Sequence, residues 1–143
     1  MKTLYHTRLY ASEDDGQTHF EDVPIDLEME TLAPAGEERL PCSRPMRAQT
    51  LVWTDAPLEW DAQPRITAHR HLLVTLKGEY QVQASDGETR NFPVGSVLLL
   101  DDVQNGVPHP VAGHTTRVIS PGGVSLLSIG LRSRSHPDFR DGD

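Results

Sequence analysis

The sequence is poor in cysteine, in basic residues and in long apolar runs. Its one cysteine, Cys42, cannot form a disulfide within the chain, which fits a reducing compartment. Thirteen basic residues against 21 acidic ones give a net charge of −8, which argues against nucleic-acid or anionic-membrane partners, since both require a basic face. The longest aliphatic run, Val97–Leu100, is too short to span a membrane, and the N-terminus lacks an apolar signal core. We therefore expect a cytoplasmic protein.

Glycine and proline, by contrast, are abundant, with eleven of each in 143 residues. Helices tolerate neither well, and the apolar residues between the turn clusters mostly alternate with polar ones, which is typical of β-strands. The length suggests one domain, for which we predict an all-β sandwich or barrel over residues 1–131 with a core at 65–120. Strands are expected at 2–10, 18–29, 46–53, 66–77, 80–84, 96–100, 114–120 and 124–131. Residues 32–45 are predicted to be an irregular connection, and 132–143 a flexible polar tail.

Two histidines on one expected strand are the first candidate site. His69 and His71 are two residues apart, so their side chains point to the same face of a strand. Two imidazoles in this arrangement suit a divalent transition metal such as iron, zinc, manganese or nickel, with His114, or alternatively His109, as a third ligand. The alternatives are that this face is exposed to solvent, or that the histidines only form hydrogen bonds and no metal is bound.

Four further residues are candidates for lining a ligand pocket. Thr75 would be polar inside a barrel, and the guanidinium of Arg65 could bind a carboxylate or phosphate. Trp60 offers a large apolar surface next to this region. Asp102 follows a buried strand, where its carboxylate could orient a histidine or act as a base, although we favour capping of the loop that begins there.

The segment Gly87–Leu100 (GETRNFPVGSVLLL) resembles the second signature of the cupin superfamily, in which a Gly is followed after five residues by Pro-x-Gly. His69-Arg70-His71 and Gly78 resemble parts of the first signature. Three runs are similar to a group of small bacterial cupins: DDGQTHFEDV at 14–23, SDGETRNFPVGSVLLLDD at 85–102 and GHTTRV at 113–118. The resemblance covers about Leu4 to Leu131 and implies a single-domain jelly-roll barrel, the double-stranded β-helix of the cupins.

The chain departs from the cupin pattern at the metal ligands. Counted back from Gly78, the family's glutamate position falls on His71, and its two histidine positions fall on Arg65 and Thr67. The histidine position of the second signature is Leu98. A metal centre would therefore be a rearranged one.

The resemblance leaves two functions open. One is a metal-dependent enzyme, an oxygenase, isomerase or lyase acting on a small organic molecule, with His69, His71 and His114 as ligands. The other is a metal-free barrel that binds a small ligand, or a degenerate cupin without catalysis. In either case we expect a homodimer that covers the edge strands, through the N-terminal strand or residues 53–60.

Overall fold

The computed structural model describes residues 4–27, 29–32, 39–60 and 63–133. Within these ranges the chain forms strands and no helix, which confirms the predicted all-β class. The strands are β1 (Tyr5–Ala11), β2 (Thr18–Pro24), β3 (Met29–Leu32), β4 (Arg39–Cys42), β5 (Ala48–Ala56), β6 (His71–Lys77), β7 (Tyr80–Ala84), β8 (Thr89–Phe92), β9 (Val97–Asp101), β10 (His114–Val118) and β11 (Val124–Leu131). A helix that could cross a membrane, long and apolar throughout, is absent from the part of the chain described.

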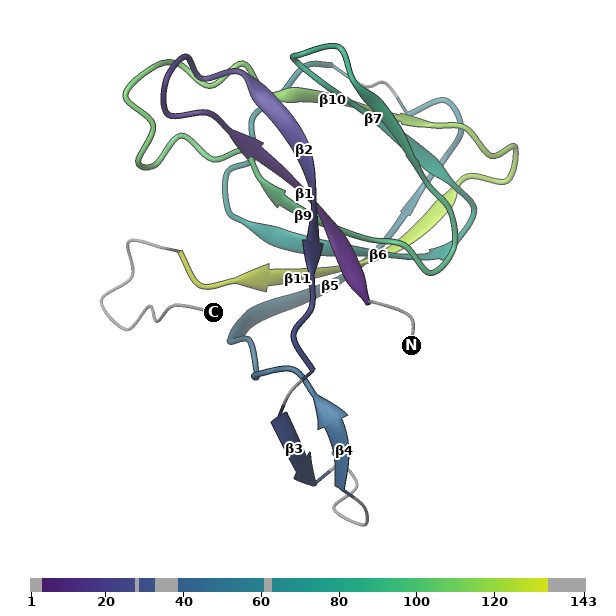
Figure 1. Ribbon diagram of the computed structural model, residues 1–143. Helices are drawn as coiled ribbons and strands as arrows, with labels where there is room; N and C mark the ends of the chain where they lie inside the picture. Colours follow the sequence, from purple (N-terminus) through teal and green to yellow (C-terminus); the bar gives the residue numbers. More distant parts are fainter. Residues whose placement is uncertain (1–3, 28, 33–38, 61–62, 134–143) are drawn as a thin grey trace.

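The strands form one large sheet, one smaller sheet and a separate hairpin (Figure 1). The six-stranded sheet has the order β2-β1-β9-β6-β11-β5, and the three-stranded sheet has the order β10-β7-β8. Neighbouring strands are antiparallel except for β1 and β9, which are parallel. The β3–β4 hairpin stands away from both sheets (Figure 1).

That hairpin corrects one expectation from the sequence. Residues 32–45 were predicted to be irregular because they contain three prolines, yet Arg39–Cys42 pairs with Met29–Leu32. Proline is compatible with a strand whose outer edge has no partner, as in this two-stranded sheet. Residues 33–38 of the connection, and residues 134–143 of the predicted tail, lie outside the described residues.

The hydrophobic core lies between the two larger sheets. Leu9, Leu98 and Leu100 face inward from the large sheet, and Tyr80 and Phe92 face them from the small one. The rings of Tyr80 and Phe92 are stacked, with centroids 5.1 Å apart. Because side chains alternate along a strand, residues of the opposite parity in the large sheet form its outer face.

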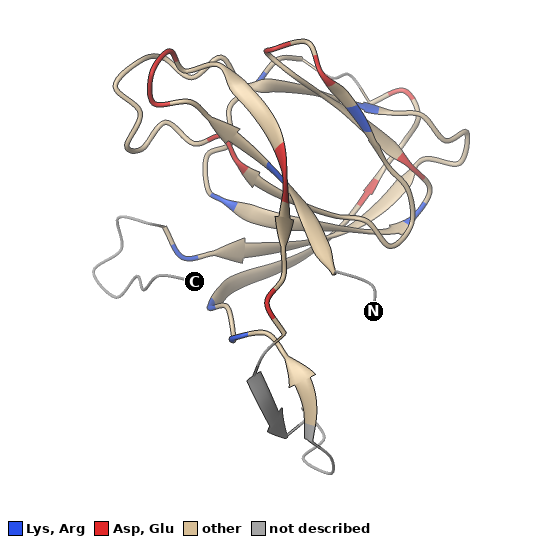
Figure 2. Cartoon of the chain, in the orientation of Figure 1, with Lys and Arg blue, Asp and Glu red and all other residues tan. Residues whose placement is uncertain are grey.

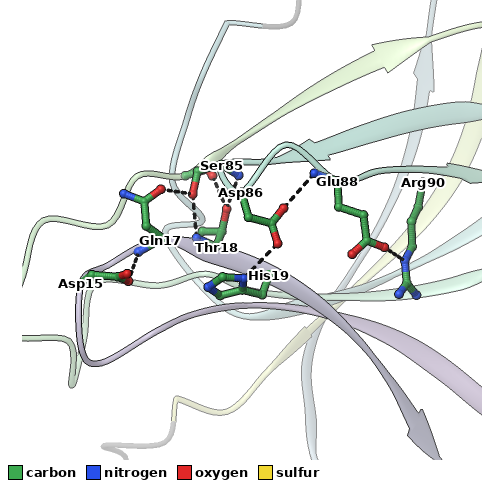
Figure 3. A network of polar contacts seen from close by, with 9 residues as sticks. Asp15, Gln17, Thr18, His19, Ser85, Asp86, Glu88 and Arg90 are labelled. Carbon is green, nitrogen blue, oxygen red and sulfur yellow. Dashed lines mark hydrogen bonds and ion pairs between the residues drawn. The ribbon is translucent and has the colours of Figure 1, made fainter.

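A polar clamp joins the turn between β1 and β2 to the turn between β7 and β8 (Figure 3). The backbone N–H of Thr18 donates to Ser85 Oγ, and the N–H of Ser85 donates to Thr18 Oγ1, both at 2.7 Å. His19 Nδ1 lies 2.9 Å from Asp86 Oδ2. The clamp fastens the edge of the large sheet to the small sheet.

Candidate functional site

His114 begins β10 and points into the space between the sheets. It pairs with Ala84 of β7, whose side chain belongs to the core, and its own residue is only 5% exposed. Its Nδ1 atom lies 2.5 Å from Asp102 Oδ2. The preceding Gly113 has φ +80°, and a Cβ there would collide with the carbonyl of Arg65, so glycine is needed to bring His114 to this position.

Asp102 connects His114 to a third segment of the chain. The residue is fully buried directly after β9, and its Oδ1 accepts a hydrogen bond of 2.5 Å from Thr67 Oγ1. The N–H of Thr67 also donates to the carbonyl of Asp102 at 3.2 Å. A buried carboxylate is costly unless it is hydrogen-bonded, and both oxygens of this one have a partner. We call Thr67, Asp102 and His114 the buried relay.

The relay explains what the sequence left open about Asp102. The capping role that we favoured for its side chain is wrong, because the carboxylate contacts Thr67 and His114. The alternation of side chains along the strand could have indicated that Asp102 points inward, because Leu98, Leu100 and Asp102 share one face and the two leucines lie in the core. Thr67 was missed as a functional residue, because a hydroxyl in an irregular segment carries no pattern of its own.

Arg65 and Trp60 lie next to the relay. Arg65 forms an isolated antiparallel bridge with His114, in which the two backbones exchange hydrogen bonds of 2.9 Å. Directly opposed residues place their side chains on the same face, so Arg65 and His114 share a side. The guanidinium of Arg65 lies 4.8 Å from the ring centroid of Trp60, and both side chains are exposed. The structure thus brings together three of the four predicted pocket residues, Trp60, Arg65 and Asp102.

Thr75, the fourth, lies elsewhere. It is buried near the far end of β6, where its hydroxyl contacts the carbonyl of Phe92 and Ser96 Oγ. It lies four positions along the strand from His71, which amounts to about 13 Å. Thr75 therefore supports the turn before β9.

The predicted metal ligands do not converge among the described residues. His71 is half-buried at the start of β6, with its Nδ1 2.7 Å from the carbonyl of His69, and the His69 residue is exposed. His109 is exposed in the loop after β9, where its carbonyl accepts a hydrogen bond from Gln104. Across the described ranges, no group of three or more His, Cys, Asp or Glu side chains is placed to hold a metal ion. These donors do not fit a metal centre in this arrangement, so the metal site stays a prediction and no step is derived from it.

A large groove lies away from the relay. It measures about 1210 Å³ and opens beside β1 and β2, with Arg8, Glu21, Arg70 and Leu99 among the lining residues. Charged residues of its lining already have partners: Arg8 lies 2.6 Å from Glu21 and 2.8 Å from Asp101, and Arg70 lies 3.5 Å from Asp101. Because a ligand would have to break these ion pairs, we place the candidate chemistry at the relay.

Comparison with known proteins adds no family to this description: no family model and no curated protein matches the chain. The class that fold and site define is an all-β protein of two facing sheets, with a buried Thr-Asp-His relay at one end of the space between them.

Proposed function

We propose that the chain is a cupin-type barrel that binds a small anionic organic molecule beside His114, and that His114 exchanges a proton with it without a metal. The facing sheets, the shared core and the turns at Gly87 and Gly95 support the barrel. The observation that carries the function is the orientation of His114 by Asp102, which leaves the other ring nitrogen for a ligand.

The chemistry follows from the hydrogen bonds of the relay. An ionised carboxylate can only accept, so the bond to Asp102 favours the His114 tautomer with its proton on Nδ1. Nε2 then carries a lone pair, and no hydrogen bond joins it to a described residue. The Thr67 hydroxyl donates to the other carboxylate oxygen and holds Asp102 in place. An imidazole fixed in this way can take a proton from a bound molecule and return it, which is general acid–base catalysis.

The ligand class follows from Arg65. Its guanidinium lies over Trp60 and shares a side with His114, so a ligand at His114 would be within reach of a planar, permanently charged group. Guanidinium groups bind carboxylates in a bidentate geometry, and the Trp60 ring offers a flat apolar surface beside it. A small carboxylic acid with a planar or apolar portion fits both groups.

Binding is tested by titrating a panel of small carboxylic acids into the ¹⁵N-labelled protein and following its amide signals by NMR. We expect at least one acid to shift the amides of Arg65, Thr67 and His114 in a saturable way, whereas its amide analogue has no effect. Arg65→Ala should weaken binding about 10-fold or more. The matched control is Arg117→Ala, because Arg117 is an exposed arginine on the opposite face of the same β10 strand. An equal loss in both variants would contradict the assignment to Arg65.

Proton transfer is tested with the acids that bind. Incubation in D₂O should exchange a carbon-bound hydrogen next to the carboxylate or a neighbouring carbonyl, and His114→Gln should slow this exchange about 100-fold or more. His109→Gln, a substitution in an exposed loop, is the control. Saturable binding without exchange would show that the protein binds the acid but does not catalyse proton transfer, and would contradict the catalytic part of the proposal.

A further inference from the structure

The peptide group between Gly113 and His114 is held at both of its polar atoms. Its carbonyl oxygen accepts a buried hydrogen bond of 2.7 Å from Thr18 Oγ1, and its N–H donates to the carbonyl of Arg65 at 2.9 Å. Because a peptide group is planar, hydrogen bonds to its oxygen and its N–H together fix the orientation of the whole plane. The Cα of His114 belongs to that plane, so the two bonds also set the point from which the His114 side chain starts.

The loop that leads to His114 needs such support. Gly113 has φ +80°, and a glycine restrains the peptide group that follows it less than any other residue does. Residues 103–113 contain no Lys, Arg, Asp or Glu that could hold the loop by an ion pair (Figure 2). Hydrogen bonds hold it instead, among them one of 2.9 Å from the N–H of Ala112 to the carbonyl of Gly16 in the turn between β1 and β2. The position of His114 therefore depends on this turn and on the start of β2.

Thr18, the first residue of β2, is placed to hold the carbonyl of Gly113 in one direction. The residue is 0% exposed, and the N–H of Ser85 donates to its Oγ1 at 2.7 Å (Figure 3). A hydroxyl has a single proton, and because the N–H of Ser85 already fills one acceptor position of the oxygen, that proton is directed at Gly113. The two bonds form a continuous chain, in which each hydrogen bond strengthens the next.

We propose that Thr18 is a positioning residue for His114, which holds the Gly113–His114 peptide so that the imidazole reaches Asp102. The imidazole ring lies several bonds away from the peptide plane, so a small rotation of the plane would lengthen the 2.5 Å contact between Nδ1 and Asp102. Thr67 holds the carboxylate of the relay, and Thr18 holds the imidazole. The catalytic consequence rests on the function proposed for His114, whereas the geometry is testable without a ligand.

The geometry is tested by the NMR signal of the His114 Nδ1–H proton in the ¹⁵N-labelled protein. A proton held between an imidazole and a buried carboxylate should resonate far downfield and exchange slowly with water, and His114→Gln should remove its signal. Thr18→Val replaces the hydroxyl by a methyl group and should speed the exchange of this proton about 10-fold or more. Thr18→Ser keeps the hydroxyl and should restore slow exchange to within about 3-fold.

Thr75→Val is the matched control for this measurement. Thr75 is also buried, and its hydroxyl also donates to a backbone carbonyl, that of Phe92. The control should leave the His114 signal unchanged. An equal effect of both valine variants would mean that any loss in the core loosens the relay. That result would overturn the proposal, as would an unchanged signal in folded Thr18→Val.

The catalytic consequence is tested on the hydrogen exchange of a bound carboxylic acid in D₂O. Thr18→Val should lower kcat about 10-fold, because the base is displaced, and should leave KM within about 2-fold, because Arg65 and Trp60 are intact. Thr18→Ser should restore kcat. A changed KM with an unchanged kcat would overturn the positioning role. If no acid exchanges but the Nδ1–H signal responds to Thr18→Val as expected, the function proposed for His114 fails and the positioning role stands.

A measurement on the unmodified protein covers the case in which Thr18→Val does not fold. The hydroxyl proton of Thr18 should exchange slowly enough to be observed, and it should show a cross-peak to the N–H of Ser85, which donates to the same oxygen. A Thr18 hydroxyl that exchanges too fast to be observed, in a protein that shows the Nδ1–H signal of His114, would mean that the imidazole is held without Thr18 and would refute the proposal.

Discussion

Asp101 and Asp102 are neighbours in the sequence, yet they serve opposite faces of the same sheet. Asp101 points outward, where its side chain is only 1% exposed and pairs with Arg8 and Arg70. Asp102 points inward, where its side chain is fully buried and contacts Thr67 and His114. The two side chains point to opposite faces because successive side chains alternate along a β-strand.

The two carboxylates differ in their partners, and therefore in the role that each can have. Arginine stays protonated at all relevant pH values, so the outer carboxylate is held in a permanent ion pair. Burial lowers the pKa of Arg8, but its hydrogen bonds to Glu21 and Asp101 outweigh burial and leave that pKa above its ordinary value. The partner of the inner carboxylate is an imidazole, which can both donate and accept a hydrogen bond, whereas a guanidinium can only donate. Of the two pairs, only the inner one contains the imidazole that the proposed proton transfer requires.

The largest effect should come from removing the inner carboxylate. Asp102→Ala leaves the buried Thr67 hydroxyl and His114 Nδ1 without their partner, and should lower the free energy of unfolding by about 3–5 kcal/mol. Urea denaturation measures this change, with exposed Asp14→Ala as the control. If Asp102→Ala cost no more than the control, the relay would not be formed in solution.

Removing the outer carboxylate should cost less. Asp101→Ala deprives Arg8 and Arg70 of a buried partner, but Arg8 keeps Glu21 and is partly exposed, so we expect about 2 kcal/mol. Proton exchange catalysed through His114 should be unchanged in this variant if it remains folded. If Asp101→Ala slowed the exchange as much as His114→Gln does, Asp101 would not have a purely structural role.

The outer face should also make stability depend on pH through His6, on β1 beside Arg8. Burial, followed by the charge of Arg8, lowers the pKa of His6 below 6.5 in the folded chain. As the pH falls, the unfolded chain therefore binds a proton at His6 before the folded chain does. The contribution of His6 to the free energy of unfolding is thus fully present above pH 6.5, and it declines below that pH until the pKa of the folded state is reached. Thermal unfolding between pH 7.5 and 5 measures the decline. His6→Gln should flatten the curve in this window, and an unchanged curve would count against burial of His6.

The polar clamp should give the smallest effect, at a lower pH. The backbone N–H of Glu88 and, to a lesser extent, His19 lower the pKa of Asp86 below 3.8. Asp86 then contributes stability that is present above pH 3.8 and lost as the pH falls through its folded pKa. Asp86→Asn should lower the melting temperature by roughly 1–3 °C at pH 7, because the site is exposed, and by less at pH 3. A constant difference at both values would mean that packing rather than charge stabilises the turn.

The sequence predicts the parts of this molecule that depend on local periodicity. Alternation over the predicted strand 66–77 correctly divides Leu72 and Val74 from Leu73 and Thr75, but the strand begins only at His71, so the prediction was wrong for residues 66–70 and for His69 as a strand residue. The turns at Gly87 and Gly95 occur where Asp-Gly and Pro-x-Gly indicate them.

The sequence offered Asp102 as a carboxylate that could orient a histidine, but it did not predict that the histidine is His114 or that Thr67 takes part, because the three residues meet from separate segments. Arg8 and Asp101, 93 positions apart, were missed for the same reason.

The parallel pairing of β1 with β9 also sets an order of events during synthesis. Strand β1 leaves the ribosome before β9, the strand that it must join, which follows about 90 residues later. At roughly 5–20 residues per second, that is a delay of about 5–20 s. During this time the apolar side of the hairpin, with Leu9 and Phe20, has no sheet to pack on. The nascent chain is therefore most exposed to aggregation before β9 emerges, and a chaperone that binds nascent chains would act on the N-terminal hairpin.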